Sequence, residues 1–133
     1  MNLSETYNYL VRARRDLWTT LENVADEVLS RPLLGGSRFQ CIKDLVFHIA
    51  DVEDGWIHGD ILGEPMVQEA FPILRTTESP HAFGSFALEM LLDYWRHVEQ
   101  STLSYLARLR TTMNRRQTAF AALPILKIDR ITA

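Results

Sequence analysis

The sequence predicts an all-α protein that folds as a single helical-bundle domain over residues 1–133. Three long stretches carry apolar residues at the three-and-four spacing of one helical face, and glycine and proline separate these stretches. Hydrophobic residues make up 47% of the chain and charged residues 23%, which is typical of a folded soluble domain. A chain of 133 residues buries about two thirds of its unfolded surface, so one core is expected.

The first predicted helix covers residues 4–29. Ser4 is a suitable N-cap residue and Glu5 places a negative charge in the first turn. Pro32 keeps the residue before it out of the helical region, so the helix is expected to end there. The apolar stripe consists of Tyr7, Leu10, Val11, Leu17, Trp18, Leu21, Val24, Ala25 and Val28.

The second predicted helix covers residues 38–62. Ser37 and Gln40 have the spacing of a capping box, and Gly63 is a suitable terminator. The connection over residues 63–79 is longer than the 2–8 residues that bundles commonly use, which indicates a functional loop or a short helix.

The third predicted helix covers residues 81–112, with Ser79 and Pro80 at its start. Its apolar pattern fades near Met113. Pro124 divides the remaining apolar residues into short pieces, so the fourth helix of the bundle is expected to be truncated or atypical.

The charge balance, the single cysteine and the lengths of the apolar runs indicate which partners and which compartment to expect. The 14 basic and 17 acidic residues give a net charge of -3, and the basic residues are spread over the whole chain, which argues against nucleic acid. We interpret Arg12, Arg14 and Arg15 as a solvated face and Cys41, the single cysteine, as a small buried apolar group. The N-terminus does not resemble a signal peptide and no apolar run approaches the ~18 residues of a membrane span, so we expect a cytoplasmic protein without membrane contact.

His48 is the most suggestive of the four histidines because it lies at the border of an apolar stripe, on the same side as Asp44 and Asp51. Two interpretations are open. The imidazole can point into the bundle centre as a metal ligand, or it can be a partly buried group that is hydrogen-bonded to a carboxylate. One histidine is not a site, because zinc or nickel needs three or four ligands.

The other histidines have simpler interpretations. His97 lies one turn after Asp93, which suggests a surface pair, although it could approach His48 across the bundle. His58 follows Asp54 by one turn near a helix C-terminus, where a cationic form would be favourable. His81 is expected to be exposed. The tryptophans, which are core residues or the lining of a pocket, are Trp18, Trp56 and Trp95.

Residues 42–56, IKDLVFHIADVEDGW, closely resemble the second helix of the DinB/YfiT-like superfamily, with its leucine, histidine, acidic residue and tryptophan in order. Residues 92–109 are similar to the family's third helix, and residues 113–116 look like the polar segment before its next loop. The resemblance covers about residues 1–118.

The resemblance implies an up-down-down-up four-helix bundle, often dimeric, in which three histidines hold a divalent metal that activates a small thiol. His48 matches the first ligand position. The other two ligands belong to an H-x-x-x-H pair on the fourth helix, and no histidine follows His97 here. We therefore expect a weak or incomplete zinc or nickel site, with His97 or Asp51 as substitute ligands.

Two functions follow from the resemblance and from this departure. The first is a divalent-metal-dependent enzyme of the hydrolase or small-thiol transferase type, acting on a small thiol or a hydrolysable compound. The alternative is a non-catalytic dimeric helical-bundle or interaction protein. Three stripes wide enough for a four-helix core leave one side uncovered, so a two-fold homodimer is expected.

Overall fold

The computed structural model describes residues 2–33, 39–75 and 83–122, and the side chains among them except those of residues 75 and 117–122. Its elements are the α-helices α1 (Leu3–Glu22), α2 (Asp26–Ser30), α3 (Ile42–Asp54) and α4 (Leu88–Ala122), the π-helix η1 (Gly55–Leu62), and the 3₁₀-helices η2 (Val67–Ala70) and η3 (Pro72–Arg75). The described ranges contain no strand, so the all-α prediction is confirmed.

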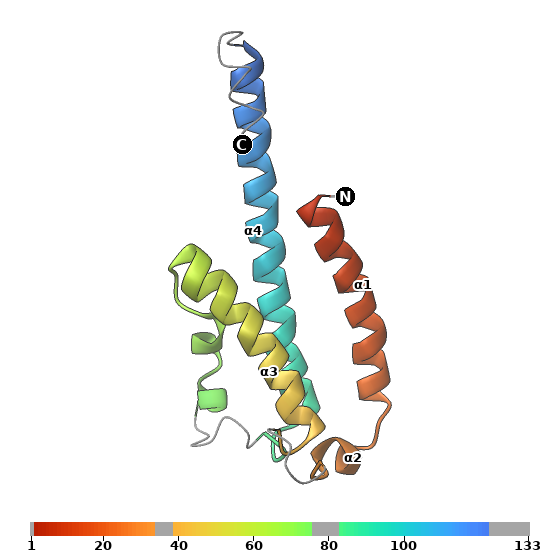
Figure 1. Cartoon of the computed structure of the whole chain (residues 1–133). Coiled ribbons are helices and arrows are strands. Elements are labelled where there is room, and N and C mark those ends of the chain that lie inside the picture. Colours follow the sequence, from red (N-terminus) through yellow and green to blue (C-terminus); the bar gives the residue numbers. More distant parts are fainter. Residues whose placement is uncertain (1, 34–38, 76–82, 123–133) are drawn as a thin grey trace.

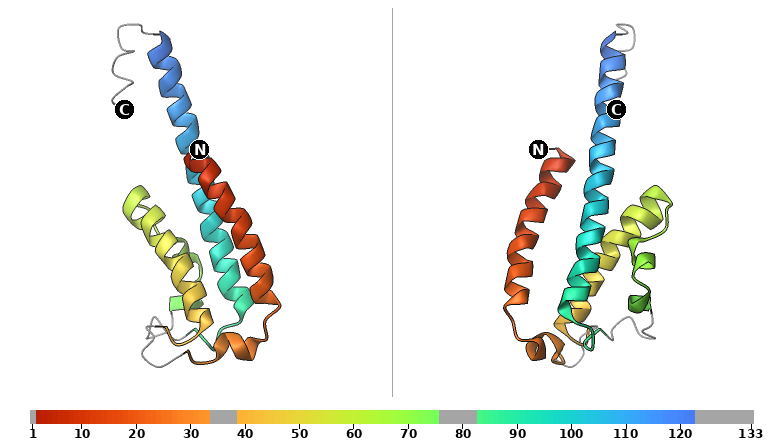
Figure 2. Two further views of the ribbon diagram at one scale, coloured as in Figure 1. Left: turned by 45° about the vertical axis from the view of Figure 1, so that its right-hand side comes forward. Right: turned by 180° about the vertical axis from the view of Figure 1, so that it is seen from behind.

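The long helix α4 is the centre of the molecule, and α1 and α3 both pack against it. Figure 1 shows α1 and α3 on either side of α4, and Figure 2 shows α4 nearest the viewer when the molecule is seen from behind. None of the described elements lies between α1 and α3 on the side that Figure 1 presents. The described residues therefore form three sides of a bundle.

Helix α1 is shorter than predicted, and its cap is Asn2 instead of Ser4. The Asn2 side chain accepts a hydrogen bond from the Glu5 amide at 2.8 Å, and Glu5 bonds back to Asn2, which completes a capping box. The helix ends at Glu22 because the Asn23 amide side chain bonds to the Thr19 carbonyl and competes with the backbone pattern. The prediction of one helix to residue 29 is therefore wrong.

Helix α3 begins at Ile42, where the carboxylate of Asp44 accepts the amides of Gln40 and Cys41. The predicted capping residue Ser37 lies outside the described residues. The chain then continues as η1 and stops at Gly63, whose φ of 62° is the left-handed conformation of a helix terminator. As expected for a long connection, short helices follow, namely η2 and η3.

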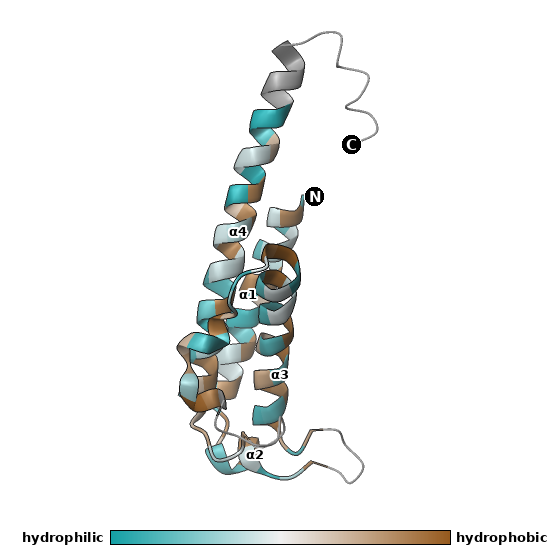
Figure 3. Ribbon diagram, turned by 90° about the vertical axis from the view of Figure 1, so that its left-hand side faces the viewer, coloured by the Kyte–Doolittle hydropathy of each residue, from teal (hydrophilic) through white to brown (hydrophobic). Residues whose placement is uncertain are grey.

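Helix α4 differs most from its prediction. It starts at Leu88, seven residues later than predicted, and continues ten residues beyond residue 112 to Ala122. The fading apolar pattern was misread as a helix end. Residues 101–122 contain no glycine or proline and many good helix formers, so the helix continues where its burial stops. In Figure 3 the coloured turns of α4 beyond the N-terminus are mostly hydrophilic.

Aromatic residues dominate the core. Trp18 and Trp95 meet edge to face with ring centroids 5.2 Å apart, and Phe47 stacks on Phe83 at 3.9 Å. Trp56 is 61% exposed, so only two of the three tryptophans are core residues. The burial of Cys41 agrees with its prediction as a small apolar group. No helix in the described ranges combines the length and apolarity needed to cross a membrane.

Candidate functional site

A buried polar cluster joins the three long helices. We call it the Arg14 cluster; its members are Tyr7 and Arg14 from α1, Glu53 from α3, and Glu99 and Thr102 from α4. Arg14 Nη2 lies 2.5 Å from Glu53 Oε1, and Nη1 lies 3.5 Å from Glu99 Oε2. Glu53 Oε2 also accepts the hydroxyls of Tyr7 at 2.6 Å and Thr102 at 2.8 Å. Glu53 is therefore the link between α1 and α3.

The cluster overturns the prediction that Arg14 belongs to a solvated face, because Arg14 is only 6% exposed. Burial alone lowers the pKa of Arg14, but the hydrogen bond and charge of Glu53 outweigh it and raise the pKa above its usual value. Burial, followed by the Glu53 carboxylate, raises the pKa of Tyr7. Arg14 therefore stays cationic and Tyr7 stays a hydrogen-bond donor.

A second buried cluster centres on Asp54 at the end of α3. Its fully buried carboxylate accepts the amides of Val67 and Gln68, each at 2.9 Å, and the hydroxyl of Tyr94 at 2.7 Å. Burial, then the hydrogen bond from Tyr94 to Asp54, raises the pKa of Tyr94. Asp54 thus ties η2 and α4 to α3.

His58 lies beside this second cluster and is buried, whereas the sequence suggested a cation at a helix C-terminus. Its Nε2 is 2.5 Å from Ser101 Oγ, and its Nδ1 is 2.8 Å from Asp54 Oδ1. These distances suggest a nucleophile, a base and a carboxylate, but the Nδ1 contact lacks the alignment of a hydrogen bond. Activation of a nucleophile requires a base that the carboxylate orients. Because the Asp54 oxygens already accept three other donors, we assign His58 and Ser101 to the packing of η1 on α4.

His48 is partly buried, and its ring centroid lies 4.8 Å from that of Phe39. Burial raises the pKa of Asp51, while the Tyr94 hydrogen bond and the nearby charge of His48 oppose this shift. His48 therefore lies within electrostatic range of Asp51, as its spacing indicated. None of its contacts with the described residues assigns it a metal, so its role as a ligand stays a prediction.

His97 does not join His48. Its side chain is 58% exposed, and Nδ1 lies 2.8 Å from the Asp93 carbonyl oxygen and 3.6 Å from the Asp93 carboxylate. The ring also meets Phe71 edge to face at 5.2 Å. The surface-pair interpretation of His97 is thus the correct one, and His81 lies outside the described residues.

The described residues do not fit the three-histidine metal centre that the resemblance implies. His48, His58 and His97 have separate surroundings on α3, η1 and α4, as their contacts show. Within residues 2–33, 39–75 and 83–122, no three side chains of histidine, cysteine, aspartate or glutamate form a group that could hold a metal ion.

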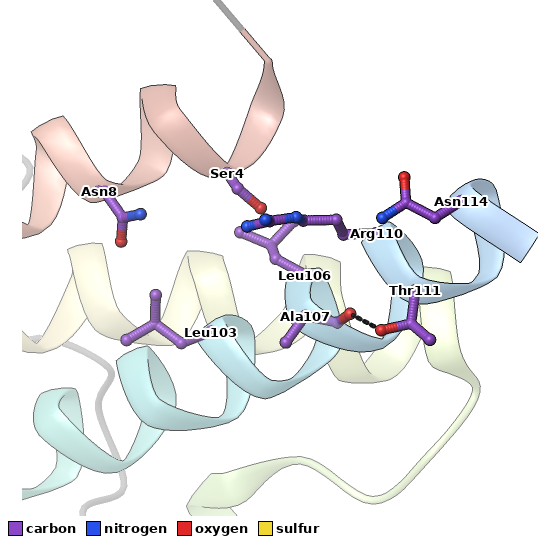
Figure 4. A pocket seen from close by; sticks show the side chains of 8 residues that line it. All are labelled: Ser4, Asn8, Leu103, Leu106, Ala107, Arg110, Thr111 and Asn114. Atoms are coloured by element: carbon purple, nitrogen blue, oxygen red, sulfur yellow. Dashed lines mark hydrogen bonds between the residues drawn. The ribbon is translucent and has the colours of Figure 1, made fainter.

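A cavity of about 450 Å³ lies where the first turns of α1 meet α4. Figure 4 shows the Arg110 side chain reaching toward Ser4 and the Thr111 hydroxyl donating to the Ala107 carbonyl of its own helix. This cavity lacks the buried, convergent polar groups that are typical of a catalytic site. Its lining consists of Ser4, Asn8, Leu103, Leu106, Ala107, Arg110, Thr111 and Asn114.

Exposed apolar side chains flank the link between α1 and α3. Leu10 and Leu17 follow Tyr7 and Arg14 on one side of α1, and Ile49 and Trp56 lie four residues before and three after Glu53. We call this surface the open face; its apolar members are Leu3, Leu10, Leu17, Ile49 and Trp56.

Comparison with known families agrees with this architecture. The profile of the DinB family matches residues 1–122, from the start of α1 to the end of α4. The chain belongs to the DinB family. Searches of curated proteins and of solved structures each gave no match. The resemblance seen in the sequence is thereby confirmed, and the activity of this DinB protein must be inferred from its own surfaces.

Sequence reasoning missed the Arg14 cluster in this DinB chain. A signal was present, because Tyr7, Arg14 and Trp18 share one side of the predicted first helix. A charged residue in line with a buried tryptophan indicates a buried ion pair. The partners Glu53 and Glu99 come from distant helices, and spacing along one helix does not identify them.

Proposed function

We propose that this DinB-family protein is a dimeric helical-bundle interaction protein whose open face binds a second copy. The observation that supports the proposal is the exposure of large apolar side chains along both walls of this face. Trp56 and Leu3 are each 61% exposed, and Leu10, Leu17 and Ile49 are each 43% exposed. Large apolar side chains that are exposed on one face commonly mark an interface.

The Arg14 cluster supports the proposal by keeping the two walls at a fixed separation. Tyr7 and Arg14 reach from α1 to Glu53 of α3, and all three are at least partly buried. A surface that is already rigid loses little conformational entropy when it binds. The open face is therefore prepared for an apolar partner.

The energetics also favour association. A standard interface buries about 800 Å² on each partner. If ~600 Å² of that area is apolar on each chain, each chain contributes about 15 kcal/mol at ~25 cal/mol/Å² before the entropy of association is subtracted. Trp56 is the expected hot spot, because a tryptophan that becomes buried in an interface commonly dominates the binding energy.

A metal-dependent hydrolase or thiol transferase is the other function that the family suggests. That activity would need ligands besides His48, and the described residues supply no such group. The apolar surface favours association over small-molecule chemistry as the primary proposal. A small thiol or hydrolysable substrate stays a prediction.

Light scattering coupled to size-exclusion chromatography tests the proposal. We expect a mass of twice 15.3 kDa at micromolar concentration, and 15.3 kDa for Trp56→Glu. Val28→Glu is the matched control, because Val28 is an exposed apolar residue on α2 at the opposite end of the molecule. The proposal fails if the unmodified protein is still monomeric when its concentration is 100 times that used for Trp56→Glu.

A further inference from the structure

The acidic residues of this protein are concentrated in residues 1–100, whereas the basic residues occur along the whole chain. Residues 1–100 contain 16 acidic and eight basic side chains, a net charge of -8. No acidic residue lies between Glu99 and Ala122, whereas this segment contains Arg108, Arg110, Arg115 and Arg116. The C-terminal part of α4 is thus a basic segment attached to an acidic body.

This basic segment extends beyond the rest of the bundle. We call residues 108–122 the arm. Figures 1 and 2 show α4 continuing past the N-terminus of α1 and past the end of η1. Its side chains from Arg110 to Arg116 are exposed.

The side of α4 that packs against the bundle continues onto the arm. Thr102 and Leu106 are buried on that side of α4, and Leu109, Met113 and Arg116 continue it at the same spacing. Met113 is 55% exposed. An apolar strip edged with arginine therefore continues from the core onto the arm, and no described element covers it there.

Two exposed carboxylates lie at the end of the bundle from which the arm extends. Asp60 is one turn after Trp56 in η1, and Glu64 follows the helix end at Gly63; both carboxylates are exposed. They lie beside the Trp56 end of the open face. An antiparallel helix placed on the open face brings basic residues to this acidic end.

We propose that two copies exchange arms, each arm lying on the partner's open face with Arg115 and Arg116 against Asp60 and Glu64 of η1. This inference rests on the proposed dimer and names the segment that fills it. A two-fold axis that is perpendicular to α4 and runs beside it makes the two α4 helices antiparallel neighbours, so each end of the dimer contains α1, α3, one α4 and the partner's arm. The contact is reciprocal. Each arm buries its own apolar strip and covers the apolar side chains of the partner's open face.

Charge reversal on each side of the contact tests the exchange. Arg115→Glu/Arg116→Glu and Asp60→Lys/Glu64→Lys should each weaken the dimer at least about tenfold in sedimentation-equilibrium Kd, because like charges then face each other. An equimolar mixture of the two variants should recover association as a heterodimer. The control matched to the arginine variant is Arg12→Glu/Arg31→Glu. It makes the same change in net charge as Arg115→Glu/Arg116→Glu, at exposed positions away from the open face, and should leave Kd within about twofold.

The outcomes separate this inference from the proposed function. A dimer that forms equally well in both reversed variants overturns arm exchange but leaves the dimer in place. Failure of the mixture to recover association, when each variant alone is monomeric and helical by circular dichroism, also overturns it. A monomeric unmodified protein overturns both proposals.

Discussion

Replacing Asp54 by alanine should remove a large part of the free energy of unfolding of this protein. The substitution removes the acceptor of two backbone amides, those of Val67 and Gln68, and of the Tyr94 hydroxyl. A buried donor without an acceptor costs about 1–3 kcal/mol. The two amides belong to partly buried residues and gain water, at about 1 kcal/mol each. The fully buried Tyr94 loses its 2.7 Å bond and keeps only a longer one, of 3.3 Å, to Asp51, at a cost of about 2 kcal/mol. The expected loss is about 4 kcal/mol, against about 5–15 kcal/mol for a whole domain.

Urea denaturation followed by circular dichroism, at one fixed protein concentration, measures this loss. Asp54→Asn should cost less than Asp54→Ala because its amide oxygen still accepts hydrogen bonds. In the Tyr94→Phe background, Asp54→Ala should cost about 2 kcal/mol less, because one donor is already absent. Asp93→Ala is the matched surface control, and we expect a change within about 0.5 kcal/mol. A loss below about 1 kcal/mol for Asp54→Ala would refute the assignment of Asp54 as the tie between η2, α3 and α4.

Three further predictions concern titration and metal content. The folded-state pKa of Asp51 is raised, so its contribution to stability falls as pH rises through that pKa; Asp51→Asn should be stabilising at pH 7 and lose this advantage below pH 4 in urea denaturation. Tyr7 and Tyr94 have raised pKa values, so the native protein at pH 11 should show less tyrosinate absorbance at 295 nm than the denatured protein, and stability should fall as pH rises above 10. Elemental analysis should find less than one zinc or nickel per chain; a stoichiometric metal that is lost in His48→Ala would contradict this expectation and revive the metal-enzyme function.

The identity and order of the long helices could be predicted from the sequence because each carries a regular apolar stripe. The stripe containing Trp18 and Leu21 identified α1, and Gly63 marked the end of the second helical segment. Periodicity did not reveal the break after Glu22. The spacing of apolar residues continues through it, and the break depends on a side-chain hydrogen bond of Asn23 that competes with the helix.

The length of α4 could not be read from burial patterns. An apolar stripe reports the part of a helix that is packed, and α4 extends beyond its packing partners. Helix propensity was the better signal for residues 113–122, which lack glycine and proline. The arm therefore became visible only when the positions of α1 and η1 relative to α4 were known.

The candidate site was the least predictable part of the protein, and His48 and His58 show why. Both stand near carboxylates at helical spacing, yet His58 is buried against Ser101 of α4 while His48 remains at the edge beside Phe39. The difference arises from the π-helix η1, which changes the direction of side chains after Asp54. A wheel drawn with α-helical geometry drifts progressively along η1, so its error is small at Trp56 and larger at His58 and beyond.

The Glu53 contacts explain how an apolar surface can remain open on a stable chain. Helices α1 and α3 each pack on α4, and Arg14 and Tyr7 hold them to one another through a single buried carboxylate. A hydrophobic link between these helices would close as tightly as its side chains allow, whereas an ion pair with aligned hydrogen bonds fixes one separation. Such a link is costly to break but adds little net stability. Its principal effect is geometric: it holds the wall that carries Leu10 and the wall that carries Trp56 at one separation.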